Sequence, residues 1–395
     1  MESRDIILFI GSLLPTKKNP EGGIFFYKLI YFLNKQVKGS YVFYPKKFKF
    51  PIKDELIKEL INITRVSYRP LFLSFGNLRF LKFIYIFLNY FSFLTFYYAI
   101  KRSYKRLIKE KHPKPNFIYS HFIFPAGLSA GILSRKENIL SIVAVGESSL
   151  DYLEFLPKDF VIRNLKKITI FISVNSKNSQ ILKEKYGVDK SKIYVIPNAA
   201  DSKIFFKKDT QICRNKLNLD QKQKYILFVG TLTKRKGIDT LLQVAKKNPS
   251  YKFILIGRDP ENFGSKINKF KNIFYEGVKT QEIISDYMNA CDLFILYSKN
   301  EGSPNVLLEA NATRLPILCS NINEHRELFG KHGAFYSNAI YNNIPDDLNK
   351  IFSSEKYKKL RHYSNQFPQK SFANRVENIY KIINEHLKTN NHNRI

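Results

Sequence analysis

Short apolar runs, bounded by polar residues or glycine and mostly followed by a helical pattern, recur along the whole chain. Tyr225–Val229 and Cys291–Tyr297 are two of them. A run of this length fits a strand buried on both faces, as in a parallel sheet covered by helices. The pattern starts afresh near residue 225, and 395 residues are enough for two domains. We therefore predict an α/β protein with two doubly wound Rossmann-like domains that face a cleft, residues 1–200 and 201–370, followed by a terminal helix in 371–395.

Two carboxylates, Glu301 and Glu309, flank a turn that opens a predicted helix in the segment 297–310. Glu309 lies four residues beyond Asn305, so these two side chains are on one face of the predicted helix. Glu309 can therefore reach the cavity at the start of this helix. Isolated glutamates are usually solvated. However, Glu309 stands in an apolar stretch, where a buried carboxylate needs a partner. This arrangement suits a phosphorylated sugar.

The start of this helix is predicted to bind an anion. We expect Ser303 to be the N-cap and Pro304 to occupy the first helical position, where its missing N–H costs nothing. The free N–H groups from Pro304 to Val306 can then receive an anionic group, assisted by the helix dipole.

The segment with Glu301 and Glu309 resembles the Glu-x7-Glu motif of retaining nucleotide-sugar glycosyltransferases of family four, the group 1 enzymes of bacterial polysaccharide synthesis. The resemblance covers nearly the whole chain and is strongest from 190 to 330. It implies the GT-B architecture, with the terminal helix packing back on the first domain. It also implies that Glu301 grips sugar hydroxyls and that Glu309 binds the ribose.

A glycine-bounded basic loop, Gly230–Gly237, follows the strand at 225–229 and leads into a helix at residue 238. A strand, such a loop and a helix together form a phosphate cradle, although the spacing of a Walker loop is missing. The loop resembles the family's Gly-Arg-x-x-x-x-Lys-Gly segment, with Lys236 in the place that binds the diphosphate. Thr231 replaces the usual arginine. One cation is therefore lost, so either Arg235 or Lys234 compensates for it or the donor binds more weakly.

Further donor contacts are expected in turns that follow strands. The pair Gly22-Gly23 comes after the first strand, and the resemblance favours Gly23 as a diphosphate contact at a helix N-terminus. By the same resemblance, Gly257, Arg258 and Val278 lie beside the nucleobase.

One histidine of the first domain, His121, directly follows the predicted strand 117–120. Ligands of open α/β sheets bind at such strand ends. The segment resembles a His-x-x-x-Pro-x-Gly stretch of the family, so we expect His121 to line the acceptor cleft. Many members carry another histidine where this chain has Gly146 and Glu147. Two roles remain open for Glu147, namely sugar contacts or the capping of the helical turn that follows it.

The chain is strongly basic, with 65 lysines and arginines against 33 acidic residues and a formal net charge of +32. Such an excess raises the possibility of nucleic-acid binding. However, the basic residues are spread along the chain, and no zinc finger, recognition helix or ribonucleoprotein motif organises them. We therefore predict no nucleic-acid partner and expect an anionic membrane surface and anionic substrates instead.

The three cysteines Cys213, Cys291 and Cys319 have no paired or metal-ligand spacing, which fits a reduced cytoplasm. The N-terminal apolar run Ile6–Ile10 is short and follows Asp5, so we interpret it as the first strand and not as a signal peptide. The expected location is cytoplasmic and peripheral, on the inner face of the cytoplasmic membrane.

Residues 83–100 carry no charge and are rich in phenylalanine and tyrosine, and a basic stretch follows them. Three interpretations remain open, in this order: a buried helix of the first domain, a helix in the membrane interface, and a membrane span. The first two are compatible on different faces of one helix.

We therefore predict a retaining hexosyltransferase that moves a sugar from a nucleotide diphosphate sugar to a hydroxyl of a lipid-linked saccharide. A UDP-sugar is favoured over GDP-mannose. No metal or other cofactor is expected, because no Asp-x-Asp motif follows a strand and cationic side chains can neutralise the diphosphate. The alternatives are a sugar-nucleotide epimerase of the same architecture and a non-catalytic basic protein that binds membrane or nucleic acid.

Overall fold

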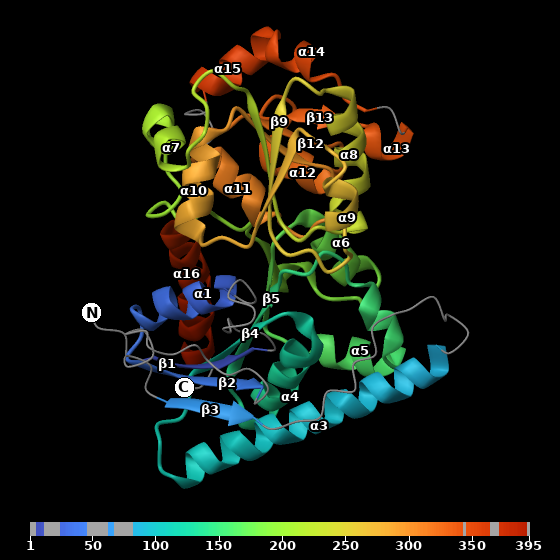
Figure 1. Ribbon diagram of the computed structural model, residues 1–395. Helices are drawn as coiled ribbons and strands as arrows, with labels where there is room; N and C mark the ends of the chain where they lie inside the picture. Colours follow the sequence, from blue (N-terminus) through green and yellow to red (C-terminus); the bar gives the residue numbers. More distant parts are fainter. Residues whose placement is uncertain are drawn as a thin grey trace. The chain divides into compact units, whose positions relative to one another are not determined.

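The computed structural model describes residues 5–11, 24–45, 62–66, 82–342, 345–363 and 371–392. The chain forms two compact units (Figure 1). Unit 1 comprises residues 1–196 and 376–395, and unit 2 comprises residues 197–375.

Unit 1 is built on a sheet whose seven described strands all pair in parallel, in the order β3-β2-β1-β4-β5-β6-β7. The strands are β1 Ile6–Ile10, β2 Gly39–Pro45, β3 Asn62–Val66, β4 Phe117–His121, β5 Leu140–Val145, β6 Ile170–Ser173 and β7 Ile193–Val195. The predicted first strand has the bounds that the structure gives to β1. The strand order reverses between β1 and β4, as in a doubly wound sheet.

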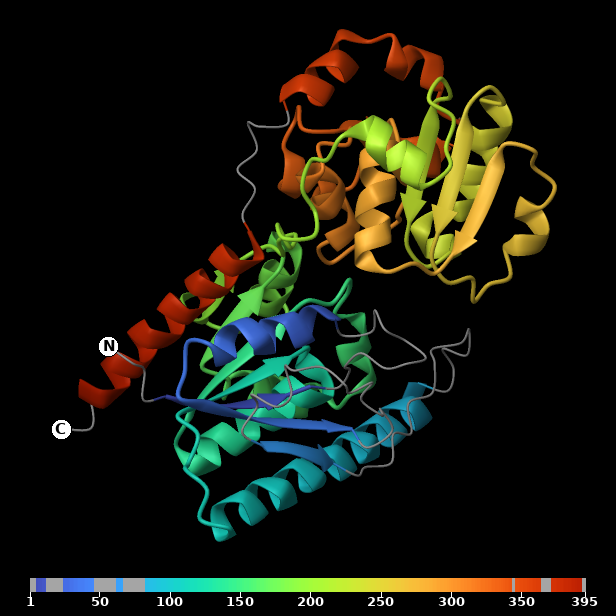
Figure 2. The same cartoon turned by 60° about the vertical axis from the view of Figure 1, so that its left-hand side comes forward.

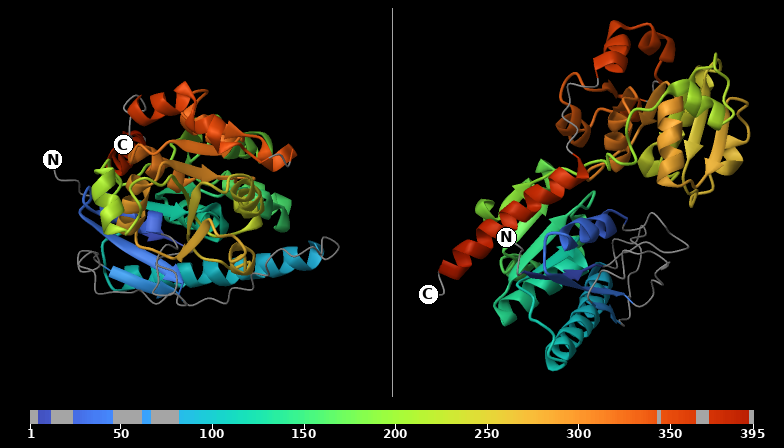
Figure 3. Two further views of the ribbon diagram at one scale, coloured as in Figure 1. Left: turned by 45° about the horizontal axis from the view of Figure 1, so that its top comes forward. Right: turned by 90° about the vertical axis from the view of Figure 1, so that its left-hand side faces the viewer.

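Helices cover both faces of this sheet, with α1 on one face and α3 on the other (Figures 2 and 3). The helical segments of unit 1 are α1 Ile24–Asn34, α3 Lys82–Lys109, a short π-helical turn Ile123–Gly127, α4 Leu128–Glu137, a 3-10 turn Asp151–Phe155, α5 Lys158–Leu165, α6 Ser176–Glu184 and a 3-10 turn Lys190–Lys192. Parallel strands need such crossover connections. Burial on both faces of the sheet explains why its central strands are mostly apolar.

Unit 2 repeats the architecture with six described strands, all parallel, in the order β10-β9-β8-β11-β12-β13. These strands are β8 Tyr225–Val229, β9 Lys252–Ile256, β10 Ile273–Gly277, β11 Leu293–Leu296, β12 Ile317–Ser320 and β13 Phe335–Ser337. The order reverses between β8 and β11. Two doubly wound α/β units confirm the predicted fold class.

The helices of unit 2 also cover both faces of their sheet, with α8 and α9 on one side and α10 and α11 on the other (Figure 1). They are α7 Thr210–Lys216, a 3-10 turn Lys234–Lys236, α8 Ile238–Lys247, α9 Gly264–Ile267, α10 Gln281–Ala290, α11 Asn305–Ala312, α12 Asn323–Phe329, α13 Ala339–Asn342, α14 Leu348–Phe352 and α15 Glu355–Tyr363.

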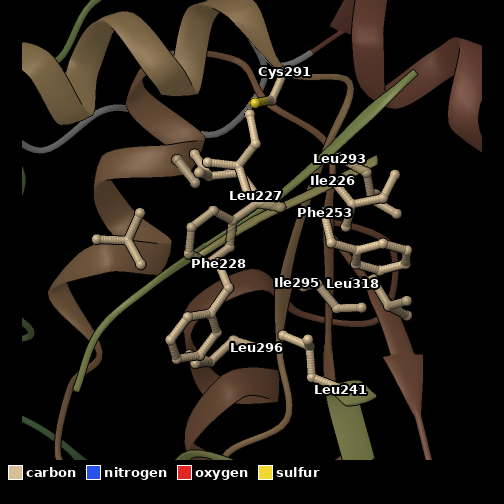
Figure 4. Close-up of a cluster of buried hydrophobic side chains, with 14 of the residues drawn as sticks. Ile226, Leu227, Phe228, Leu241, Phe253, Cys291, Leu293, Ile295, Leu296 and Leu318 are labelled. Carbon is tan, nitrogen blue, oxygen red and sulfur yellow. The ribbon is translucent and has the colours of Figure 1, made fainter. Parts of the chain in front are cut away.

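The core of unit 2 lies around its two central strands, β8 and β11 (Figure 4). Every residue of both strands is buried. Leu241 from α8 and Phe253 from β9 pack into the same cluster. This burial fixes the two strands whose ends carry the predicted donor site. The three cysteines are all buried and unbridged.

The terminal helix α16, Phe372–His392, begins where the Phe372 N–H donates to the carbonyl of Ala200 at 3.1 Å. Farther along, the His386 ring meets the ring of Tyr194 edge-on, with centroids 5.9 Å apart. Tyr194 lies on β7, so this part of the helix packs beside the edge strand of unit 1.

Candidate functional site

The candidate site of unit 2 lies at the carboxyl ends of β8 and β11, where the strand order reverses. Open parallel sheets bind ligands at this switch point, because the loops that follow the two strands diverge there. The loop 230–237 follows β8, and the loop 297–304 follows β11. These loops contain the two predicted motifs.

Glycine at position 237 allows the two loops to touch backbone to backbone. Gly237 has a φ of 73°, and a Cβ at this position would lie 2.1 Å from the carbonyl oxygen of Tyr297. Only glycine tolerates both the left-handed conformation and this approach. The N–H of Lys299 donates to the carbonyl of Arg235 at 2.9 Å and fixes the contact.

Lys236 and Glu301 form an ion pair across these loops, with Nζ and Oε1 2.5 Å apart. The Thr233 hydroxyl accepts the backbone N–H of Lys236 at 3.2 Å, which caps the short turn that carries the lysine. Only 12% of the Lys236 side chain and 7% of the Glu301 side chain are exposed. The structure thus brings the predicted diphosphate contact, Lys236, and the predicted sugar contact, Glu301, into direct contact.

Glu301 stays ionised although it is buried. Burial raises the pKa of this carboxyl, but the Lys236 ammonium and hydrogen bonds from Lys236 and Ser298 outweigh it and hold the pKa below its ordinary value. The Ser298 hydroxyl donates to Oε1 at 2.5 Å. Arg235 adds a weaker contribution, with its Nη1 3.7 Å from Oε2. An ionised carboxylate can only accept hydrogen bonds, so it suits the hydroxyls of a sugar.

The helix start after Glu301 differs from its prediction. Helix α11 begins at Asn305, so Pro304 is the N-cap and not the first helical residue, and no side chain caps the helix. Ser303 is not the N-cap, because its hydroxyl accepts the backbone N–H of Asn198 at 3.4 Å. Pro304 has a ψ of 98°, which is extended and not helical.

Asn305 and the residues after it keep their expected places on α11. The Asn305 side-chain oxygen accepts an N–H of the Asn198 amide at 2.9 Å. Val306 lies in the first turn, where an α-helix has unpaired N–H groups. Glu309 is one turn farther along and half-buried.

The remaining donor-side residues gather on neighbouring strand ends of the same sheet edge. Gly257 has a φ of 143°, and a Cβ there would lie 1.9 Å from the carbonyl oxygen of Gly230, so the ends of β8 and β9 pack tightly. The carbonyl of Arg258 accepts the N–H of Leu232 at 2.7 Å. Thr231 is half-buried, whereas the side chains of Arg258 and Val278 are exposed.

His121 belongs to unit 1, where it ends β4 at the switch point of that sheet. Its ring stacks on Phe26, with centroids 5.2 Å apart, and lies 4.2 Å from the ring of Phe122. The predicted contact Gly23 lies outside the described residues.

Glu147, after the neighbouring strand β5, holds the turn that follows His121. Its Oε1 accepts the backbone N–H of Ile123 and the hydroxyl of Tyr152, both at 2.7 Å. Burial raises the pKa of this carboxyl to about 7. These contacts join the turn after β4 to the turn after β5 and do not decide between the two roles left open by the sequence.

A buried histidine behind Glu301 was missed. His325 on α12 is fully buried, and its Nδ1 lies 2.9 Å from the carbonyl oxygen of Ser320. The Ser320 hydroxyl donates to the carbonyl of Ser298 at 2.5 Å, and Ser298 donates to Glu301. Burial lowers the pKa of His325, which favours the neutral ring. Its position shortly after the apolar run 316–319 was the sequence feature that could have pointed to it.

Within the residues that the structure describes, no group of three or more histidine, cysteine, aspartate or glutamate side chains is placed to hold a metal ion. Lys236 and Arg235 are charged side chains of this sheet edge that lie within ion-pair distance of Glu301.

Comparison with known proteins identifies proteins that are similar to this chain. Residues 209–367, which include both loops of the site, match the family model "Glycosyl transferases group 1". Residues 209–367 therefore resemble the group 1 glycosyltransferases. Among the relatives of the chain is a putative teichuronic acid biosynthesis glycosyltransferase, TuaC, of Bacillus subtilis, which is 28% identical over 234 residues, 58% of each chain.

Another relative is the Escherichia coli O-antigen biosynthesis glycosyltransferase WbnH, 29% identical over 203 residues, which are 51% of this chain and 55% of WbnH. The matched part thus spans little more than half the length of TuaC and WbnH.

Solved structures agree on the GT-B fold over nearly the whole chain. Anabaena HepE, solved in complex with UDP, superposes with a TM-score of 0.70 at 12% identity, over 96% of this chain and 100% of HepE. WaaG, a glycosyltransferase involved in lipopolysaccharide biosynthesis, superposes with a TM-score of 0.66 at 14% identity, over 95% of this chain and 99% of WaaG.

Proposed function

We propose that this group 1 protein is a retaining hexosyltransferase of bacterial cell-surface polysaccharide synthesis. It moves a sugar from a UDP-sugar to a hydroxyl of a lipid-linked saccharide. The ion pair between Lys236 and Glu301 at the switch point of unit 2 is the observation that carries the proposal. The names of TuaC and WbnH support the pathway, and the complex of HepE with UDP-glucose supports the donor.

Lys236 stabilises the departing diphosphate in this proposal. When the bond between the sugar and the diphosphate breaks, negative charge grows on the leaving oxygen, and a preorganised cation lowers the energy of that state. An ammonium has three N–H donors, of which Glu301 accepts one. The others serve the phosphate oxygens. Arg235, which is more exposed, adds a second cation at the loop's edge.

Glu301 orients the sugar. Its pKa is lowered, so at neutral pH it presents acceptor oxygens and no proton. A hydroxyl that donates to an ionised carboxylate makes a short, charge-assisted bond, which fixes the sugar ring against the phosphate-binding loop. The binding of the ribose by Glu309 and of the diphosphate by the first turn of α11 completes the proposed donor site.

The test is transfer itself, measured with a panel of UDP-hexoses and GDP-mannose and a lipid-linked saccharide, followed by product analysis. We expect one UDP-sugar to give an elongated, anomerically retained product. Glu301→Gln should reduce turnover by about 10²-fold or more with the fold preserved by circular dichroism. Glu282→Gln, an exposed carboxylate on α10, is the matched control and should be silent.

Three results would contradict the proposal. Conversion of the sugar nucleotide without an acceptor would indicate an epimerase. Inversion at the anomeric carbon would exclude the retaining reaction. Unchanged turnover in Glu301→Gln would remove Glu301 from the site.

A further inference from the structure

Helix α3 has an exposed apolar stripe that the proposed chemistry does not use. The side chains of Phe83, Phe87, Phe91 and Tyr98 are 83%, 64%, 46% and 60% exposed. The three phenylalanines are four residues apart and Tyr98 follows seven residues later, so the four side chains lie on one face of the helix. Phenylalanines this exposed, in a row, mark an interaction surface more often than isolated exposed residues do.

The same face continues as a basic surface. Arg102, Lys105 and Lys109 follow Tyr98 at spacings of three or four residues, and all three are exposed. Arg106, in contrast, is paired with Glu110 at 2.8 Å. One helix face thus carries exposed aromatic rings from Phe83 to Tyr98 and exposed cations from Arg102 to Lys109.

The opposite face of α3 is part of the core of unit 1. Phe93 and Tyr97 belong to one buried cluster, and Phe96, Ile100 and Tyr104 belong to another. By length and composition, Phe83–Lys109 is a helix that could cross a membrane, and it is the one such helix in the described chain. However, a span would expose this buried face to lipid and strip the sheet of its cover (Figure 3). A helix lying in the plane of the interface keeps both faces satisfied.

We infer that the exposed face of α3 binds the surface of an anionic phospholipid bilayer, with Phe83, Phe87 and Phe91 in the interfacial region and the basic half on the headgroups. Aromatic rings favour the membrane interface, and each cation near an anionic surface adds to the attraction. A protein partner would have to match rings and cations along the whole helix. An anionic bilayer supplies an apolar interface for the rings and negative headgroups for the cations.

This inference rests on the proposed function in one respect, since it gives the lipid-linked acceptor a reason to be near the enzyme. It also corresponds to the predicted location on the inner face of the cytoplasmic membrane. The surface can be tested separately from the chemistry, because α3 contributes no residue to the candidate donor site.

The experiment is flotation of the full-length protein with vesicles of phosphatidylcholine, with or without phosphatidylglycerol, at low and high salt. We expect binding to the anionic vesicles that weakens with salt. Arg102→Gln/Lys105→Gln/Lys109→Gln should weaken binding by about 100-fold. The control Lys222→Gln/Lys246→Gln/Lys271→Gln removes the same charge from exposed positions of unit 2 and should bind like the wild type.

A second pair of variants tests the aromatic half. Phe83→Ser/Phe87→Ser/Phe91→Ser should lose binding that survives high salt, whereas Phe206→Ser/Ile212→Ser/Tyr341→Ser in unit 2 should not. UDP-induced stabilisation, measured in parallel, should be unchanged in all four variants. This shows that they remain folded.

Absence of vesicle binding, or equal loss in the charge-matched control, overturns the inference. So does a dimer, detected by light scattering, that the phenylalanine variant dissociates, because α3 would then bind a second copy. These outcomes leave the proposed transfer reaction intact. Vesicle binding without sugar transfer would instead contradict the proposed function and support the surface.

Discussion

Two carboxylates at the carboxyl edges of the two sheets, Glu301 in unit 2 and Glu147 in unit 1, have opposite protonation behaviour. Burial acts on both. Glu301 faces Lys236 and Arg235, and its pKa is lowered. Glu147 accepts hydrogen bonds from neutral groups, backbone N–H groups that include that of Ile123 and the Tyr152 hydroxyl, and its pKa rises to about 7. The charge of the neighbouring groups therefore decides the protonation state of each carboxylate. This is expected where burial raises a carboxyl pKa and a nearby cation lowers it.

We interpret the Glu301 environment as a ligand site and the Glu147 environment as a structural contact between two loops. The charged pair of unit 2 keeps a cation and an acceptor together where an anionic sugar nucleotide would bind. The contacts of Glu147 instead join the turn after β4 to the segment after β5. Four changes would break or sharpen this comparison.

Lys236→Met should have the largest effect, a loss of turnover of about 10²- to 10³-fold, because it removes the cation nearest to the diphosphate. It also leaves Glu301 buried without its main partner, so the pKa of Glu301 should rise. Steady-state kinetics with the UDP-sugar measure this loss. Lys224→Met is the matched control, since Lys224 pairs with buried Asp292 at the opposite end of β8, 3.0 Å away. Equal losses in both variants would contradict a special role for Lys236.

Gly237→Ala should destabilise unit 2 by about 3 kcal/mol, since alanine disfavours a φ of 73° and its Cβ would overlap the Tyr297 carbonyl. Gly146→Ala in unit 1 should cost less than about 1 kcal/mol. There the new Cβ would meet its nearest atom, in the Phe122 ring, at 3.4 Å. Urea unfolding of both variants measures the difference. A tolerated Gly237→Ala would show that the two loops are not held as described.

Glu147→Gln should change how stability depends on pH. The folded pKa of Glu147 is raised, so the folded state binds more protons than the unfolded state between about pH 4.5 and 7. Stability should therefore fall by up to about 3 kcal/mol as pH rises through this window. The variant should lack this part of the fall. In contrast, the contribution of Glu301 is lost when pH falls, so Glu301→Gln should alter only the acid side. Parallel thermal unfolding profiles that match the wild type in both variants would refute the assignments.

Arg235→Ala should have the smallest effect, about two- to fivefold on kcat/KM. Its guanidinium is 3.7 Å from Glu301 and 45% of its side chain is exposed, so solvent screens its charge. A loss as large as that of Lys236→Met would move the main phosphate contact to Arg235.

Much of the fold could be predicted because it depends on local patterns. Apolar runs gave the central strands, and β8 has the predicted bounds. The polar edge strand β3, Asn62–Val66, lacks such a run and was missed. The helix at 83–100 was expected with two different faces, which α3 has.

The details of the site depend on contacts between distant segments, which a local pattern does not contain. Ser303 looked like an N-cap, but Asn198, more than 100 residues earlier, binds its hydroxyl. His325 joins the site only through Ser320 and Ser298, which the fold brings together from separate loops. Glu301 and Lys236 could be named from their motifs, yet their direct ion pair could not.

The most direct test of the central claim, that the Lys236–Glu301 pair forms a nucleotide-sugar site, is thermal stabilisation by UDP in the presence of EDTA. Ligands that bind the folded state raise its apparent stability by mass action. We predict a rise in Tm of a few degrees, about 2 to 4 °C at saturating UDP, that persists in EDTA and in Lys224→Met and disappears in Lys236→Met. No shift in the wild type, or an equal shift in Lys236→Met, would contradict the claim.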